Sequence, residues 1–122
     1  MDSAVPVLIV DAANVVGSRP DGWWRDRPAA AKRLRDAVKP LASDHEIFLV
    51  VEGEARGLAP TEGVGVIGAV GSGDDEIVRL AAASVERGRR VVVVTADREL
   101  RRRLAEVGAE SAGPRTLPYV GA

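Results

Sequence analysis

The sequence predicts an α/β fold, a three-layer open parallel sheet of four or five strands with helices on both faces. Short apolar, largely β-branched runs alternate with longer segments that carry apolar residues at helical spacing. The connections between these segments are short, and no internal repeat or linker interrupts the alternation, which favours right-handed crossovers within one core. We therefore expect a single domain over residues 1–122, with an irregular tail over residues 113–122.

The first strand is expected at the apolar run from Val7 to Val10. An uninterrupted apolar run of this kind is typical of a parallel strand covered on both faces. Asp11 follows at the carboxyl end of the run, the edge of an open α/β sheet where ligands bind. Glycine, proline and aspartate over residues 17–22 then predict a loop above this edge.

A helix and a second strand are expected next. Asp26 followed by Pro28 is a typical cap and first turn, and apolar residues at helical spacing continue to Leu41. The run over residues 47–51 is again wholly apolar and ends in a carboxylate, Glu52. This run therefore predicts a second buried strand with an acid at its carboxyl end.

The second half of the chain repeats the alternation of strand and helix. Glycines weaken the third strand, acidic residues open the helix that follows it, and glycines close both later helices. The elements expected are a strand over 64–70, a helix over 74–87, a strand over 91–94, a helix over 98–107 and a short strand over 109–112.

Composition excludes several classes of protein. The chain has no cysteine and one histidine, which argues against a disulfide scaffold and against a structural zinc cluster. The sequence has neither an apolar run long enough to span a membrane nor a signal-peptide pattern, so we expect a cytoplasmic protein that does not contact membranes. The net charge of −1 leaves the choice of partner to the distribution of charge.

Acidic residues follow three of the expected strands and open one helix. In a parallel sheet the carboxyl ends of the strands share one edge, so these residues should meet although they are far apart in sequence. Neighbouring carboxylates repel one another unless protons or a cation neutralise them, and oxygen ligands without histidine or cysteine favour Mg²⁺ or Mn²⁺. The candidate metal ligands are Asp11, Glu52, Asp74, Asp75 and Asp97.

A carboxylate site of this kind is suited to phosphodiester hydrolysis. The bound metal generates hydroxide from water, orients the phosphate and stabilises charge on the attacking and leaving oxygens. Asn14 and Thr95 are candidates for holding ligand waters or carboxylates from a second layer.

Four motifs in this order resemble the acidic motifs of the PIN-like nucleases, especially the NYN branch that includes the YacP-type bacterial ribonucleases. The motifs span about residues 7 to 112 and are Val10-Asp11-Ala-Ala-Asn14-Val15, Val51-Glu52-Gly53, Gly73-Asp74-Asp75-Glu76-Ile77 and Val94-Thr95-Ala96-Asp97.

The resemblance implies a PIN-like fold and a metal-dependent endoribonuclease that acts on RNA. It places Asp11, Asp74 and Asp97 at the positions of the family's metal-binding acids and Asn14 at its characteristic asparagine. Glu52 departs from the aspartate usual in the YacP-type motif, which leaves its role open. Asp74 is preferred to Asp75 because it opens the helix, although the sequence does not separate the two.

Basic and aromatic residues near these motifs are candidates for binding RNA. Arginines gather after the first strand and after Asp97, where they can attract phosphate or, alternatively, remain solvated helix residues. The adjacent tryptophans can stack on unpaired bases, although packing over the core end or in a dimer contact is the plainer interpretation. The candidates are Arg19, Trp23, Trp24, Arg25 and Arg98.

Other interpretations stay open. Each acid taken alone can be a solvated residue or a helix cap, and a non-catalytic α/β module could bind RNA, a nucleotide or a protein at the same edge. A haloacid-dehalogenase-type phosphatase fits less well, because Ala13 stands where its second aspartate is required and no lysine follows Lys39. A homodimer remains open, and nothing in the sequence indicates an antitoxin partner. The glycines at 63, 65 and 68 match a dinucleotide-binding pattern, but they fall within or before an expected strand, no helix starts there, and no acid follows about twenty residues later at a strand end.

Overall fold

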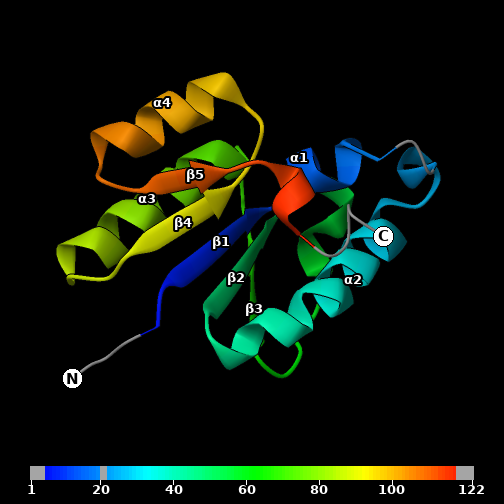
Figure 1. The fold of residues 1–122 in the computed structure, drawn as a ribbon. Helices are drawn as coiled ribbons and strands as arrows, with labels where there is room; N and C mark the ends of the chain where they lie inside the picture. The colour runs from blue at the N-terminus through cyan, green and yellow to red at the C-terminus, as the bar shows by residue number, and fades with distance from the viewer. Residues whose placement is uncertain (1–4, 20–21, 118–122) are drawn as a thin grey trace.

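The computed structural model describes residues 5–19 and 22–117, and it has the predicted α/β architecture. Its five-stranded sheet is parallel throughout, with strand order β3-β2-β1-β4-β5 (Figure 1). The strands are β1 (Val7–Asp11), β2 (Glu46–Val51), β3 (Val64–Gly68), β4 (Val91–Val94) and β5 (Glu110–Ala112).

The helices cover both faces of the sheet, as expected (Figure 1). Buried side chains of α1 and α2 share one apolar cluster, and those of α3 and α4 share the other. The helices are α1 (Ala12–Gly17), α2 (Arg27–Val38), α3 (Gly73–Glu86) and α4 (Arg98–Glu106). No helix in these described segments is both long enough and apolar enough to cross a membrane.

Strand β1 lies at the centre of the sheet and supplies both apolar layers. All of its residues are buried, because β2 and β4 flank it and helices cover its two faces. Side chains of a strand alternate between faces, so Leu8 and Val10 pack toward α1 and α2 while Val7 and Ile9 pack toward α3 and α4. This two-sided burial explains why the run over residues 7–10 contains no polar residue.

Two helical segments differ from the expectation. The pattern after β1 did not predict α1, where Val15 and Val16 are poor intrinsic helix formers but are buried against α2. The helix expected to reach Leu41 ends at Val38 and continues as the 3-10 helix η2 (Lys39–Ser43). Proline at position 40 explains this change, because it lacks the N–H that would continue the α-helical ladder.

The third strand and the tail also differ from the expected boundaries. β3 ends at Gly68, and Val70, expected within this strand, is 91% exposed in the loop that follows. The described part of the tail is not wholly irregular, because the 3-10 helix η4 (Pro114–Thr116) carries Leu117 into the apolar cluster beneath α2. The rest of the expected tail, residues 118–122, lies outside the described residues.

The glycines around β3 serve packing. A Cβ atom on Gly65 would lie 3.1 Å from the ring of Phe48, and one on Gly68 would lie 2.7 Å from the carbonyl oxygen of Arg56. Arg56 belongs to the 3-10 helix η3 (Gly53–Gly57), which lies against β3. Glycine at positions 65 and 68 therefore allows the close approach of neighbouring segments.

Candidate active site

The candidate site lies where the strand order reverses. From β1 the chain adds strands outward on one side through β2 and β3, and on the other side through β4 and β5. The crevice at the carboxyl ends of the two strands that flank such a switch point is the usual ligand site of an open α/β sheet. Asp11 ends β1, and Thr95 and Asp97 follow β4, so the sequence-predicted residues converge here.

Asp11 is a buried carboxylate, with 6% of its surface exposed. The Thr95 hydroxyl donates a hydrogen bond to its Oδ2 at 2.9 Å, and the Asn14 amide N–H donates to its Oδ1 at 3.4 Å. The pKa of Asp11 is raised to about 6, chiefly by burial; the hydrogen bonds from Thr95 and Asn14 oppose this rise, and the negative charges of Asp74 and Glu52 add to it. This carboxylate is therefore poised to gain or lose a proton near neutral pH.

Thr95 and Asn14 join the two central strands of the site. The Thr95 Oγ1 atom also accepts a hydrogen bond from the Asp97 amide N–H at 3.2 Å. The Asn14 side-chain oxygen accepts one from the Ala96 amide N–H at 2.8 Å. Both side chains thus hold the loop between β4 and α4 against the start of α1.

Asp97 begins α4 as its N-cap. Its Oδ1 atom accepts a hydrogen bond from the Leu100 amide N–H at 3.0 Å, which satisfies a helix N–H that has no partner within the helix. The capping interpretation of this acid is therefore correct, and it does not exclude a second role. The charge of Asp97 also raises the pKa of Asp74, because the two carboxylates lie near enough to repel each other.

Glu52 and Asp74 meet at the start of α3. The Glu52 Oε2 atom accepts a hydrogen bond from the Gly73 amide N–H at 2.9 Å. A Cβ atom at position 73 would lie 2.3 Å from this oxygen, so glycine gives the carboxylate room to approach. Partial burial raises the pKa of Asp74, and the charges of Asp97 and Glu52 raise it further.

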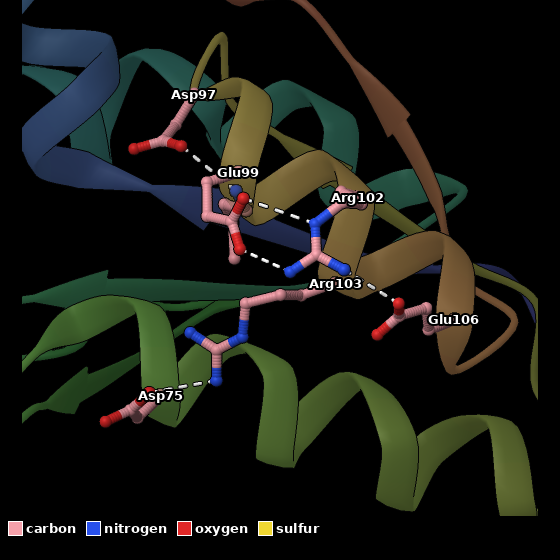
Figure 2. A network of polar contacts seen from close by, with 7 residues as sticks. Asp75, Asp97, Glu99, Arg102, Arg103 and Glu106 are labelled. Atoms are coloured by element: carbon pink, nitrogen blue, oxygen red, sulfur yellow. Dashed lines mark hydrogen bonds and ion pairs between the residues drawn. The ribbon is translucent and has the colours of Figure 1, made fainter.

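Asp75 points to a different partner from Asp74. It is exposed and forms an ion pair with Arg103 of α4, at 2.9 Å between Oδ1 and Nη2. Figure 2 shows this pair between the two helices, with Asp97 apart from it at the beginning of α4. The structure thus separates two neighbouring acids that the sequence left equivalent.

The donor chemistry of this edge suits a hard divalent cation, because carboxylates, a hydroxyl and an amide are all oxygen ligands. Across residues 5–19 and 22–117, however, no group of three or more acidic, histidine or cysteine side chains is arranged to hold a metal ion. The carboxylates influence one another's pKa values, yet several of their oxygens accept hydrogen bonds from backbone N–H groups. Metal binding would require these side chains to turn toward one another.

The predicted substrate-binding residues lie in two places. Trp23 packs partly buried against the apolar cluster of α1 and α2, whereas Trp24 is 54% exposed, and their rings meet edge to face. Arg25 lies over the ring of Trp24, with 5.8 Å between its Cζ atom and the ring centroid. The other two candidates are Arg19, just after α1, and Arg98, exposed at the start of α4.

Two further arginines, which the sequence placed only within the two basic clusters, make contacts close to the site. Arg27 stacks over Trp23, with its Cζ atom 5.4 Å from the ring centroid. Arg101 donates a hydrogen bond from Nε to the Thr95 carbonyl oxygen at 3.1 Å. Arg101 lies four residues after Asp97 and therefore on the same face of α4. This spacing could have predicted that Arg101 contacts the site.

Comparison with known proteins identifies the fold. Two crystal structures of Rae1 (YacP) from Bacillus subtilis resemble this chain, one of them of a W164L mutant. The mutant superposes with a TM-score of 0.76 at 20% identity and covers 90% of this chain and 70% of its own. The other gives a TM-score of 0.73 at 22% identity, with 94% of this chain and 70% of its own covered.

These structures show that the chain shares the fold of Rae1 (YacP). No protein-family model and no curated protein sequence matches it. The predicted relationship to YacP-type proteins is therefore confirmed for the fold, and the narrower NYN assignment stays a prediction.

Proposed function

We propose that this protein is a metal-dependent endoribonuclease that hydrolyses RNA phosphodiester bonds at the carboxyl edge of its sheet. One observation carries the proposal. Asp11 at the end of β1 and Asp74 in α3 are carboxylates from separate elements that each have a raised pKa: the charge of Asp74 contributes to the rise at Asp11, and the charges of Asp97 and Glu52 contribute to the rise at Asp74. An acidic cluster with shifted pKa values in the switch-point crevice is a favoured candidate for a catalytic site.

The carboxylates of Asp11, Asp74 and Asp97 would hold Mg²⁺ or Mn²⁺. When bound, such an ion supplies an activated water and charge stabilisation for phosphodiester hydrolysis. The chain's own residues prepare the site: Thr95 orients Asp11, and Asn14 holds the loop that carries Asp97. Glu52 anchors the start of α3 through Gly73, and thereby positions Asp74.

The fold and the motifs support the same proposal from different directions. The chain shares its fold with Rae1 (YacP), and the order of its acidic motifs resembles that of the YacP-type ribonucleases. Arg25, just before α2, and Arg98, at the start of α4, are exposed and offer positive charge to an RNA backbone. A cytoplasmic location belongs to this proposal.

A second function has one observation in its favour. Because no three acidic side chains are arranged for metal binding in the described segments, the same edge could bind RNA without cleaving it. The two functions differ in whether product forms when Mn²⁺ is added.

The deciding experiment incubates the full chain with labelled RNA and DNA oligonucleotides, with Mn²⁺, with Mg²⁺ and with chelator. We expect metal-dependent cleavage of RNA. Asp11→Asn and Asp74→Asn should each lower the rate by about a hundredfold or more, as expected when transition-state charge stabilisation is lost.

Asp75→Asn is the matched control, because Asp75 pairs with Arg103 on the outside of α3 and α4. It should keep most of the wild-type rate. Metal-independent cleavage, or equal loss in the Asp74 and Asp75 variants, would contradict the proposed site. RNA binding without any product would establish the non-catalytic alternative.

A further inference from the structure

A small pocket lies beside the candidate active site and has no role in the proposed hydrolysis. It is a cavity of about 160 Å³ between α1, α2, the end of β2 and the 3-10 helix η3. Most of its wall is apolar, and one side is formed by Trp23. Two charged residues, Arg27 and Glu52, complete the lining.

The size of the pocket restricts its ligand. A drug-sized molecule needs a pocket of roughly 300 Å³ or more, and a dry cavity of about 150 Å³ binds benzene in a well-studied protein. A cavity of about 160 Å³ therefore accommodates one planar ring. A fused two-ring system would extend beyond its wall.

The polar groups of the lining favour one chemistry for that ring. Glu52 is exposed and uses Oε2 to accept the Gly73 amide N–H, which leaves Oε1 open to a ligand. A carboxylate oxygen only accepts hydrogen bonds, so a ring that presents a donor to it is favoured over one that presents an acceptor. Arg27, stacked over Trp23 at the same pocket, places positive charge beside the ring.

We propose that this pocket binds the base of a cytidine in the RNA strand, with its exocyclic amino group donating to Glu52. Carboxylate side chains characteristically accept from this amino group, and the indole of Trp23 supplies an apolar wall for the ring. Uracil is the same size but presents a carbonyl oxygen at that position, which the carboxylate repels. Adenine and guanine carry amino groups but have two fused rings.

The position of the pocket ties the base to the reaction. Ala12 lines the pocket and directly follows Asp11, so a base held here belongs to a nucleotide next to the phosphate at the carboxylates. This inference deepens the proposed ribonuclease function by naming the nucleotide that the site prefers. Its binding part can be tested without cleavage.

The binding test compares cytidine 5′-monophosphate with uridine 5′-monophosphate, which differ in the base and share the phosphate. Both are titrated into the full chain in chelator, with amide chemical shifts as the readout. Indole fluorescence in a Trp24→Phe background reports on Trp23. We expect shifts at residues of the pocket and about tenfold weaker binding of the uridine nucleotide, the discrimination of one well-formed base contact.

Two variants change the pocket without removing an active-site aspartate. Ala55→Leu fills the cavity from η3 and should weaken binding of the cytidine nucleotide at least tenfold. Ala59→Leu makes the same change on an exposed residue outside the lining and should bind like the wild type. Glu52→Gln can donate as well as accept, so the preference for cytidine over uridine should fall toward unity, which a merely structural role would not produce.

Equal affinity for the two nucleotides, or shifts that fall outside the pocket, would overturn the cytidine site. Binding that survives Ala55→Leu unchanged, with the variant folded by its amide spectrum, would overturn it as well. If the wild type cleaves RNA but shows no cytidine binding, this inference fails and the ribonuclease stands. If cytidine binds in the pocket but no RNA is cleaved, the ribonuclease fails and the base site stands.

Discussion

Asp11 is a buried carboxylate whose pKa is raised above its ordinary value. A carboxylate at the end of the central strand is buried by the helices on both sides, and burial disfavours its charged form. The Thr95 hydroxyl and the Asn14 backbone N–H donate hydrogen bonds to its two oxygens and offset part of the free-energy cost of burying the charge. The part of the cost that is not offset favours binding of a proton or a cation, because either one neutralises the buried charge.

Asp11→Asn should stabilise the metal-free protein at neutral pH. The raised pKa of about 6 means that the Asp11 contribution to stability is greatest below pH 3.8 and is lost as the pH rises toward 6. The asparagine variant avoids this loss, so its advantage should grow between pH 4 and 6 and reach up to about 3 kcal/mol at pH 7 to 8. Urea unfolding in chelator across this pH range measures the difference.

Glu62→Gln is the control for that series, since Glu62 is exposed and precedes β3 at the opposite edge of the sheet. Its stability difference from the wild type should stay nearly constant with pH. A destabilised Asp11→Asn variant at pH 8 would mean that the Thr95 and Asn14 hydrogen bonds outweigh the cost of burying the charge.

The 3-10 helix η3 shows how a short element shapes the crevice. It begins directly after Glu52 and forms one wall of the pocket through Gly53 and Ala55. Its position depends on contact with β3, where Gly68 lets the backbone of Arg56 approach. Gly68 at the end of β3 thus influences the wall of the pocket through η3, the element that precedes β3 in the chain.

Gly68→Ala should therefore destabilise the protein and disturb η3. Its Cβ atom would lie 2.7 Å from the Arg56 carbonyl oxygen, and this backbone atom can move only with the rest of η3. We expect a loss of about 1–3 kcal/mol, the usual range for overpacking. Gly71→Ala meets no atom within 4 Å and should change stability by less than about 0.5 kcal/mol. Chemical denaturation of both variants tests the prediction, and equal stabilities would show that η3 shifts freely.

At the scale of the whole molecule, the order of the strands assembles the site. The chain builds outward from β1 in both directions, so one edge of the sheet receives the ends of β1, β2 and β4. The start of α3 reaches the same edge through Glu52. Negative charge gathers there while exposed arginines stand beside it, although the net charge of the chain is only −1.

Mn²⁺ should stabilise the folded protein through this edge. A ligand that binds only the native state adds about 2.7 kcal/mol at a free concentration of one hundred times Kd, which corresponds to several degrees in Tm. We expect this rise in Tm for the wild type and a much smaller one for Asp11→Asn. Thermal unfolding with and without Mn²⁺ measures it, and an equal rise in both proteins would place the ion elsewhere.

The pattern of apolar and acidic residues was sufficient to predict the sheet, its layers and the acids at its carboxyl edge. Strands covered on both faces require unbroken apolar runs, and the residues that follow such runs must lie at the edge. Asp11, Glu52 and Asp97 occupy such positions at or after the ends of their strands. The local pattern does not predict α1, because burial of Val15 and Val16 overrides their weak helix propensity.

The partners of the acidic side chains at this edge depend on tertiary packing. Asp75 pairs with Arg103, Glu52 accepts a hydrogen bond from Gly73, and the charge of Asp97 raises the pKa of Asp74. Tertiary packing also forms the pocket between η3 and α2. Each of these contacts joins segments that are separated in the chain and brought together by crossovers, so no local pattern of residues encodes them.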